Sequence, residues 1–138
     1  MQVRFKKLHP DAVIPQYAKP GDAGLDLTAV SCRFENDQVI YGTGLAVEIP
    51  DGYVGLIFPR SSVYKTGLVL SNCVGVADSG YRGELGARFY TAGYGMDYGP
   101  GDRICQLVIL PYPQIEPVEA EELSSTERGT GGWGSSGR

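Results

Sequence analysis

QVIYGTGLAVEIPDGYVGLIF, at residues 38–58, contains the clearest fold signal in the chain. Two runs rich in Val, Ile, Leu, Tyr and Phe, at 38–49 and 53–58, flank the tripeptide Pro-Asp-Gly at 50–52. β-Branched and aromatic residues favour strands, whereas Pro, Asp and Gly favour turns. This segment therefore predicts short consecutive strands that are connected by tight turns.

The same pattern recurs on both sides of this segment. Further strand-like runs lie at residues 3–8, 24–30, 67–77, 84–91 and 103–112. Further turn signals, each with a glycine, lie at 19–22, 78–80 and 99–102. Only residues 61–66 and 119–124 are candidates for a helical turn. Many short strands with frequent turns are typical of an antiparallel sandwich, jelly roll or barrel, so we predict a single all-β domain.

The composition limits the class of protein. The chain has 138 residues, of which 42% are hydrophobic, and this is enough for one domain with a core of its own. Its net charge of −4 argues against a protein that coats nucleic acid. No apolar run approaches the ~20 residues of a membrane span, and residues 1–10 lack the apolar core of a signal peptide. We therefore expect a cytoplasmic protein with no nucleic-acid or membrane partner.

The cysteines and the single histidine argue against two kinds of chemistry. Cys32, Cys73 and Cys105 are far apart and form no CxxC pair, so a zinc site is not expected. Cys73 and Cys105 lie in apolar runs and are expected to be buried. His9 lies beside Pro10 in a loop and is expected at the surface. No histidine is then left to activate a serine or cysteine nucleophile.

The C-terminal residues 128–138, RGTGGWGSSGR, are rich in glycine and contain the only tryptophan, Trp133. Such a tail is either a frayed linker or an arm that closes on a ligand. Trp133 and Arg128 favour the second interpretation, because an indole stacks on a flat base and a guanidinium binds phosphate. We predict a domain at residues 1–123 followed by a flexible arm at 124–138.

Two polar features of the body are candidate site residues: an anion site at Arg60, Ser61 and Ser62, and the carboxylate of Asp26. Arg60, Ser61 and Ser62 follow a strand-like run and Pro59, where the start of a helical turn would leave N–H groups unpaired. The alternative is a serine-rich helix start with a surface arginine. Asp26 alternates with leucines, as in a strand. It is either solvated or a buried partner that holds an arginine in place, and we favour the arginine partner.

A third candidate region is residues 74–81, which the pattern predicts to be a β-hairpin with Ser-Gly at its tip. Asp78 is either a simple turn residue or a carboxylate in a partly dry space that polarises a water molecule. Tyr81 offers a ring to a flat or puckered ligand. Asn72 offers a donor and an acceptor together, as the reading of an amide-like base edge requires.

Five ordered segments resemble the signature motifs of the homotrimeric dUTPase family. They are AGLDL at 23–27, PRSS at 59–62, GVADSGYRGE at 75–84, GDRICQL at 101–107 and RGTGGWGSSG at 128–137. The resemblance spans nearly the whole chain and implies a jelly-roll, β-clip-like subunit of a homotrimer. It also implies hydrolysis of dUTP to dUMP and pyrophosphate, which lowers dUTP and supplies dUMP for dTMP synthesis. Each active site would combine residues from three chains.

The resemblance also assigns roles to individual residues. Asp78 would activate the water that attacks the α-phosphorus, and Tyr81 would pack on the deoxyribose. Uracil would be read by Asn72 together with the backbone of Val76 and Ala77. The phosphate-facing residues would be Arg60, Ser61, Ser62 and Gln106, with Asp26 in indirect support.

The arm would complete the site. Arg128, Ser135 and Ser136 would grip the outer phosphates, and Trp133 would lie over the uracil where the family usually has Phe or Tyr. The implied cofactor is Mg²⁺, which would be held by the substrate phosphates and waters without a direct protein ligand.

Two alternatives remain open at this stage. The first is dCTP deaminase, which shares the fold and a similar PRSS segment, although it commonly carries an acidic residue where this chain has Arg82. The second is a non-catalytic nucleotide-binding or regulatory protein on the same scaffold, and the intact Asp78 and Arg128 argue against it.

Overall fold

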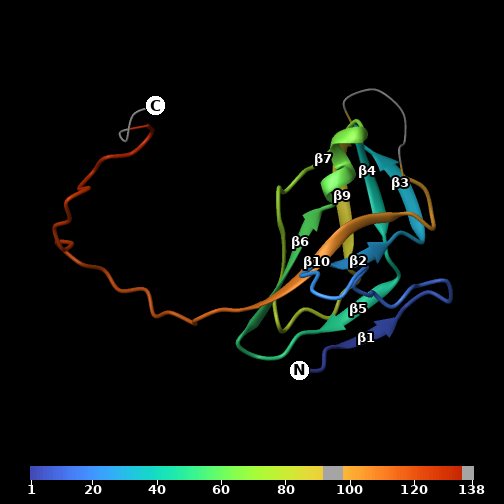
Figure 1. The fold of residues 1–138 in the computed structure, drawn as a ribbon, viewed down its shortest axis with the longest axis horizontal. Helices are drawn as coiled ribbons and strands as arrows, with labels where there is room; N and C mark the ends of the chain where they lie inside the picture. The colour runs from blue at the N-terminus through green and yellow to red at the C-terminus, as the bar shows by residue number, and fades with distance from the viewer. Residues whose placement is uncertain (92–97, 135–138) are drawn as a thin grey trace.

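Ten β-strands and one short 3-10 helix make up the described part of the computed structural model, residues 1–91 and 98–134 (Figure 1). The elements are β1 (Arg4–Lys7), β2 (Leu25–Thr28), β3 (Ser31–Glu35), β4 (Gln38–Gly42), β5 (Leu45–Glu48), β6 (Tyr53–Pro59), η1 (Ser61–Lys65), β7 (Leu68–Leu70), β8 (Gly75–Ala77), β9 (Gly86–Thr91) and β10 (Arg103–Pro111).

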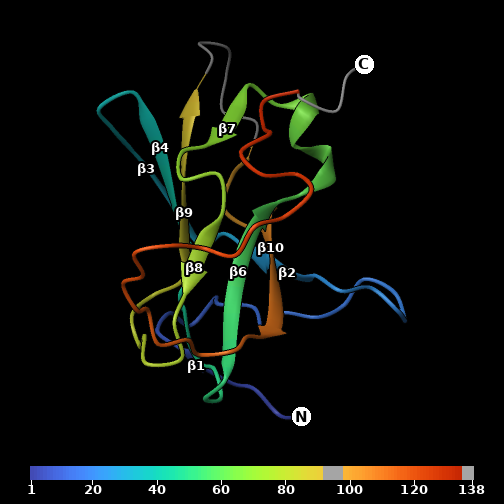
Figure 2. The same ribbon diagram turned by 90° about the vertical axis from the view of Figure 1, so that its left-hand side faces the viewer.

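Two four-stranded antiparallel sheets form the body, in the orders β2-β10-β6-β8 and β3-β4-β9-β7. Figure 2 shows β6 and β10 in one layer and β4 and β9 in the other. The pair β1-β5 forms a separate two-stranded sheet. This arrangement is a jelly roll, and the all-β prediction is confirmed.

The segment at 38–58 supplies one strand to each of the three sheets. Its strands β4, β5 and β6 follow one another directly but do not pair with each other. Gly44 and Gly52 lie at the two connections with positive φ angles of 63° and 79°, a region that glycine adopts without strain. A Cβ atom on Gly44 would also lie 2.7 Å from that of His9. The glycines thus let the chain cross between the layers.

The interior between the sheets contains a cluster of three aromatic rings. The ring centroid of Tyr41 on β4 lies 5.9 Å from that of Phe89 on β9, in an edge-to-face arrangement. Tyr98 adds a third ring, whose centroid lies 6.2 Å from that of Tyr41, and its carbonyl oxygen accepts a hydrogen bond from the Tyr41 hydroxyl at 3.0 Å. The rings pack against Leu27 and Leu107 of the opposite sheet within one buried core.

The turn predictions are confirmed at all four positions. Backbone hydrogen bonds close the turns at 19–22, 50–53, 78–81 and 99–102. Strand β3, however, was missed, because its mostly polar and exposed sequence gives a weak strand signal. A tight two-residue loop joins it to β4, with Asn36 and Asp37 at φ angles of 47° and 60°. Positive φ at both positions is the requirement of a type I′ hairpin turn, which Asn and Asp tolerate.

Three local predictions need correction. The helical turn expected at 61–66 is present as η1, but residues 119–124 contain no helix. The segment 74–81 is not a hairpin, because β8 pairs with β6 and the chain then continues into β9 of the other sheet. Cys73 is exposed instead of buried, since it lies in a bend with a φ angle of 60°, whereas Cys105 is buried as expected.

The chain beyond β10 leaves the body. The described residues 112–134 contain no helix or strand and lie almost entirely at the surface. In Figure 1 this segment extends far to one side of the sandwich, so it makes little contact with its own domain. Within the described parts of the chain, no helix is long and apolar enough to cross a membrane.

Candidate active site

Three of the five motifs meet on adjacent strands. In the sheet β2-β10-β6, Asp26 of β2 lies opposite Gln106 of β10, and Gln106 lies opposite Phe58 of β6. The segment PRSS continues from the end of β6 into η1. Strand pairing therefore brings AGLDL, GDRICQL and PRSS together, although Asp26 and Gln106 are 80 residues apart in the sequence.

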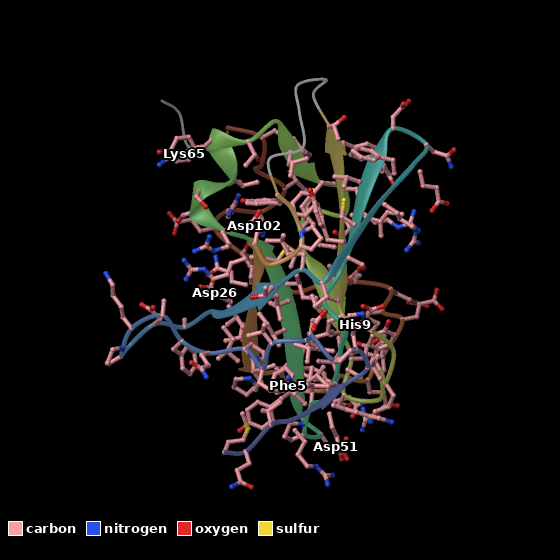
Figure 3. All side chains as sticks on the ribbon, turned by 90° about the vertical axis from the view of Figure 1, so that its right-hand side faces the viewer. Phe5, His9, Asp26, Asp51, Lys65 and Asp102 are labelled. Atoms are coloured by element: carbon pink, nitrogen blue, oxygen red, sulfur yellow. The ribbon has the colours of Figure 1, made fainter. Side chains whose placement is uncertain are left out.

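The carboxylate of Asp26 holds two arginines. Its Oδ1 accepts a hydrogen bond from Nε of Arg60 at 3.0 Å, and its Oδ2 accepts one from Nη1 of Arg103 at 2.9 Å. The Asp26 side chain is only 16% exposed, and Figure 3 shows it with nitrogen-bearing side chains close by. The prediction that Asp26 holds an arginine is confirmed, and its side chain is half-buried instead of buried. Two guanidinium groups on one carboxylate leave a net positive charge, which favours an anion.

Arg103 is a member of this cluster that the sequence analysis missed. It lies inside the motif GDRICQL but was not assigned a role. The available signal was the second oxygen of the Asp26 carboxylate, which can accept from another arginine while the first oxygen accepts from Arg60. Only the register between β2 and β10 reveals that Arg103 is that cation.

A cavity of about 440 Å³ opens beside this cluster. Its lining residues are Ala18, Asp22, Ala23, Gly24, Asp26, Arg60, Ser61, Gln106 and Val108. The amide of Gln106 donates from Nε2 to the carbonyl oxygen of Pro59 at 3.2 Å, which fixes its orientation toward the start of η1.

Arg60 precedes the first turn of η1, whose leading N–H groups have no partner within a helix. Ser61 is exposed and Ser62 half-buried in that turn. Guanidinium, amide and hydroxyl donors of this kind bind phosphate oxygens.

A second cavity, of about 530 Å³, contains the candidate base- and sugar-binding residues Asn72 and Tyr81. Gly75 of β8 and Leu70 of β7 contribute to its walls. The Tyr81 hydroxyl donates to the carbonyl oxygen of Glu84 at 3.0 Å. A Cβ atom on Gly83 would lie 2.4 Å from that hydroxyl oxygen, so only glycine permits this orientation of the ring.

Asp78 lies at the turn that follows β8. The preceding residue, Ala77, is 3% exposed and Val76 is 65% exposed, so successive side chains of β8 point to the core and to the surface. Asp78 itself is exposed. Among the described residues of a single chain, none buries the Asp78 side chain, so the partly dry space expected there is not formed by one chain alone.

The remaining predicted residues lie in the arm. Arg128 donates from Nε to the carbonyl oxygen of Gly131 at 2.9 Å and makes no ion pair among the described residues. Trp133 is fully exposed. Ser135 and Ser136 lie outside the described residues. One chain therefore carries three separate groups of site residues: the two cavities, which share no lining residue, and the arm.

Metal ligands are not gathered in the described residues 1–91 and 98–134, which contain no cluster of three or more His, Cys, Asp and Glu side chains.

Burial raises the pKa of the Cys105 thiol to about 12 from its ordinary value of 9.0, so this cysteine is an inert core residue.

Fold and site together define a jelly-roll protein with one cavity lined by guanidinium, amide and hydroxyl groups beside β2 and β10, and a second cavity that contains Asn72 and Tyr81. The family model described as dUTPase matches residues 11–137 of the chain. Deoxyuridine 5′-triphosphate nucleotidohydrolase of Rhodococcus erythropolis is 44% identical over 99% of this chain and 87% of its own length. The deoxyuridine 5′-triphosphate nucleotidohydrolase of a Hydrogenobaculum species is 41% identical over 99% of both chains.

Solved structures agree with these relatives. A variant of the Staphylococcus bacteriophage 80alpha dUTPase with dUpNHpp has a TM-score of 0.87 and 30% identity, over 99% of both chains. A dUTPase variant from phage phi11 of S. aureus, described with a structural Mg(II) ion, has a TM-score of 0.76 and 28% identity over 88% of this chain and 98% of its own. The chain belongs to the dUTPase family. Its activity is the hydrolysis of dUTP to dUMP and pyrophosphate.

Proposed function

We propose that the enzyme hydrolyses dUTP at a site that three copies of the chain assemble. The observation that carries this proposal is the separation of the three groups of site residues within one chain. The cavity beside Asp26 (the phosphate cavity) shares no lining residue with the cavity of Asn72 and Tyr81, and Asp78 lines neither of them. The arm extends away from the sandwich (Figure 1), and its Trp133 is fully exposed. A homotrimer would bring one group from each chain to a common site.

The phosphate cavity would bind the triphosphate. Arg60 and Arg103 are held in place by Asp26, so their free N–H groups need no reorganisation when an anion arrives. Ser61 and the amide of Gln106 would add neutral donors. Asp26 would act as the support of the two arginines and not as a direct ligand of the substrate.

The second cavity would select the nucleoside. Asn72 and the backbone of Val76 and Ala77 would pair with the uracil edge, and cytosine would be rejected because its donor and acceptor positions are exchanged. Close approach of this backbone to the base would leave little room for the methyl group of thymine. Tyr81, locked by its bond to Glu84, would pack on the deoxyribose and exclude a 2′-hydroxyl.

Asp78 would hold the attacking water. The water oxygen bonds to the α-phosphorus while its proton passes to the Asp78 carboxylate. The bond from the α-phosphorus to the oxygen that bridges to the β-phosphorus breaks, and pyrophosphate leaves with that electron pair. Such a displacement depends on positioning and charge stabilisation and requires no covalent enzyme intermediate.

Mg²⁺ fits this site as an ion carried by the substrate. The Asp26 carboxylate already accepts from two arginines, and the Asp22 carboxylate accepts the N–H of Lys19 at 2.9 Å, whereas Arg60, Ser61 and the amide of Gln106 offer donors that suit phosphate oxygens. Arg60, Ser61 and Gln106 would therefore hold the ion through the triphosphate. When bound, Mg²⁺ would neutralise charge on the phosphates.

The arm at residues 124–138 would act as a lid. Arg128 with Ser135 and Ser136 would bind the outer phosphates, and Trp133 would stack on the uracil. Closure would exclude all water except the one held by Asp78. The glycines of the arm would permit tight folding over the substrate and reopening for product release.

We also propose a cytoplasmic location. Cys73 and Cys105 form no disulfide. Free thiols, one of them exposed, are typical of a reducing compartment.

A mixing experiment tests the shared site. Asp78→Asn removes the carboxylate but keeps the arm, and a chain that ends at Ser125 keeps the carboxylate but lacks the arm. Each variant alone should hydrolyse dUTP with Mg²⁺ at least about 100-fold more slowly than the parent. When equal amounts of the two variants assemble at random, about one quarter of the shared sites combine an intact Asp78 with an intact arm. About one quarter of the parent activity should therefore return.

The outcomes separate the alternatives. An absence of recovery in verified mixed trimers would mean that one chain supplies both groups. A fully active Asp78→Asn enzyme would contradict the catalytic role of this residue. Release of ammonia from dCTP, in place of pyrophosphate from dUTP, would identify a deaminase instead.

A further inference from the structure

Arg82 closes the turn that carries Asp78. A single guanidinium nitrogen, Nη1, donates to the carbonyl oxygen of Ser79 at 2.6 Å and to that of Tyr81 at 2.9 Å. The turn has one backbone hydrogen bond of its own, from the N–H of Tyr81 to the carbonyl oxygen of Asp78 at 3.0 Å. The side chain of Arg82 thus bonds both sides of a turn that the backbone closes only once.

The other end of the guanidinium faces β5. Nη2 of Arg82 lies 4.0 Å from Oε1 of Glu48, the last residue of β5. The same carboxylate oxygen accepts a hydrogen bond from Arg4, which lies opposite Glu48 in the β1-β5 pair. Glu48 is therefore paired with the neighbouring strand, and its carboxylate offers Arg82 an ion pair outside the turn. The planar fork of arginine suits such a bridge between carbonyls and a carboxylate.

This turn needs an external support. Residues 78–85 contain no strand or helix, and Asp78 is exposed. A Cβ atom on Gly80 would meet no atom within 4 Å, so the tip of the turn is surrounded by open space. The tip of the turn therefore gains little from packing, and the hydrogen bonds of Arg82 help to orient it.

Arg82 contributes more to geometry than to stability. Its side chain is 54% exposed and that of Glu48 is 40% exposed, and ion pairs with this exposure add little to the free energy of unfolding. Tyr81 has an independent attachment, because its hydroxyl bonds the carbonyl of Glu84, and the Glu84 carboxylate accepts the N–H of Gly44 at 2.7 Å. The ring that would bind the sugar therefore does not rely on Arg82.

We propose that Arg82 is a positioning residue for hydrolysis, which aims the Asp78 carboxylate at the attacking water and is itself held by Glu48. This inference rests on the proposed role of Asp78. It predicts that loss of Arg82 slows the chemical step but leaves substrate binding intact. Misplacement of a catalytic group by about 1 Å costs on the order of 100-fold in rate.

The test compares steady-state kinetics of Arg82→Met, Arg82→Lys, Asp78→Asn and the double variant Arg82→Met/Asp78→Asn. Arg82→Met should lower kcat by about 10- to 100-fold and change KM by less than about threefold. Arg82→Lys should recover part of kcat, because an ammonium group can donate to the same carbonyls. The double variant should be no slower than Asp78→Asn alone, because Arg82 acts through Asp78.

Two controls separate positioning from damage to the fold. The midpoint of thermal unfolding of Arg82→Met should fall by no more than about 5 °C. Lys7→Met, which also removes one exposed positive charge, should keep the parent kcat.

Each contrary result has a distinct meaning. An unchanged kcat in Arg82→Met, beside an inactive Asp78→Asn, would overturn the positioning role alone. Additive losses in the double variant, or a rise in KM without a fall in kcat, would also overturn it. An active Asp78→Asn would overturn the proposed role of Asp78 and this inference with it.

Discussion

Gly24 and Gln106 are in such close contact that a Cβ atom on Gly24 would lie 2.4 Å from Oε1 of Gln106 and 3.1 Å from its Cβ atom. Gly24 comes from the motif AGLDL, and Gln106 from GDRICQL on the neighbouring strand β10. The absence of a side chain at Gly24 is therefore what allows the amide of Gln106 to lie in the phosphate cavity and donate to Pro59.

Gly24→Ala should displace this amide without unfolding the protein. The glutamine side chain is flexible and can turn away, at the cost of its bond to Pro59, a net loss of about 1 kcal/mol in the free energy of unfolding. A displaced amide no longer reaches a phosphate, so KM for dUTP should rise about tenfold. Steady-state kinetics check this expectation, with Gly99→Ala as the control, because a Cβ atom on Gly99 meets only one atom, at 3.9 Å. An unchanged KM in Gly24→Ala would exclude Gln106 from substrate binding.

Asp26→Asn should weaken the phosphate cavity more strongly. The amide keeps the size of the carboxylate but loses its charge, and its NH₂ group would face one of the two guanidinium groups of Arg60 and Arg103. We expect kcat/KM to fall by about 100-fold and the free energy of unfolding to fall by about 1–2 kcal/mol. Urea titration and kinetics of the same preparation measure both changes. A variant with lost stability and normal kcat/KM would make Asp26 a structural residue only.

Local sequence signals predicted the parts of the fold that depend on neighbouring residues. The turns at 19–22 and 99–102 follow from their own Gly and Pro residues, and the run at 103–112 is long and apolar enough to be a strand. Strand β3 was not predicted, because a strand at the edge of a sheet needs no run of apolar residues.

The features that could not be predicted from the sequence depend on pairing between distant segments. The burial of Cys73 was predicted from its apolar neighbours, but the bend between β7 and β8 places it at the surface. The role of Arg103 required the register of β2 against β10. The pairing of Asp26 with an arginine succeeded from sequence, because a charged residue between two leucines in a strand needs a partner of opposite charge.

Cys105 should make the stability of the protein depend on pH in the alkaline range. Burial raises the pKa of its thiol from 9.0 to about 12, so the folded state keeps the proton that the unfolded state releases above about pH 9. The stabilisation is complete below pH 9 and is lost as the pH rises toward 12, at about 1.4 kcal/mol per pH unit for one proton. Urea titrations from pH 8 to 10.5, at one protein concentration, should show a steeper loss for the parent than for Cys105→Ala. Equal slopes in the two proteins would contradict this assignment.

Trp133 should report closure of the arm directly. It is the only tryptophan and is fully exposed, so the emission of the free enzyme should be that of an indole in water. Stacking on uracil would remove this exposure and bring the indole against another π-system, so a non-hydrolysable dUTP analogue with Mg²⁺ should shift or quench the emission. Pyrophosphate alone offers phosphates without a base and should leave the spectrum unchanged. If the analogue binds by calorimetry and the emission stays constant, Trp133 does not stack on the base.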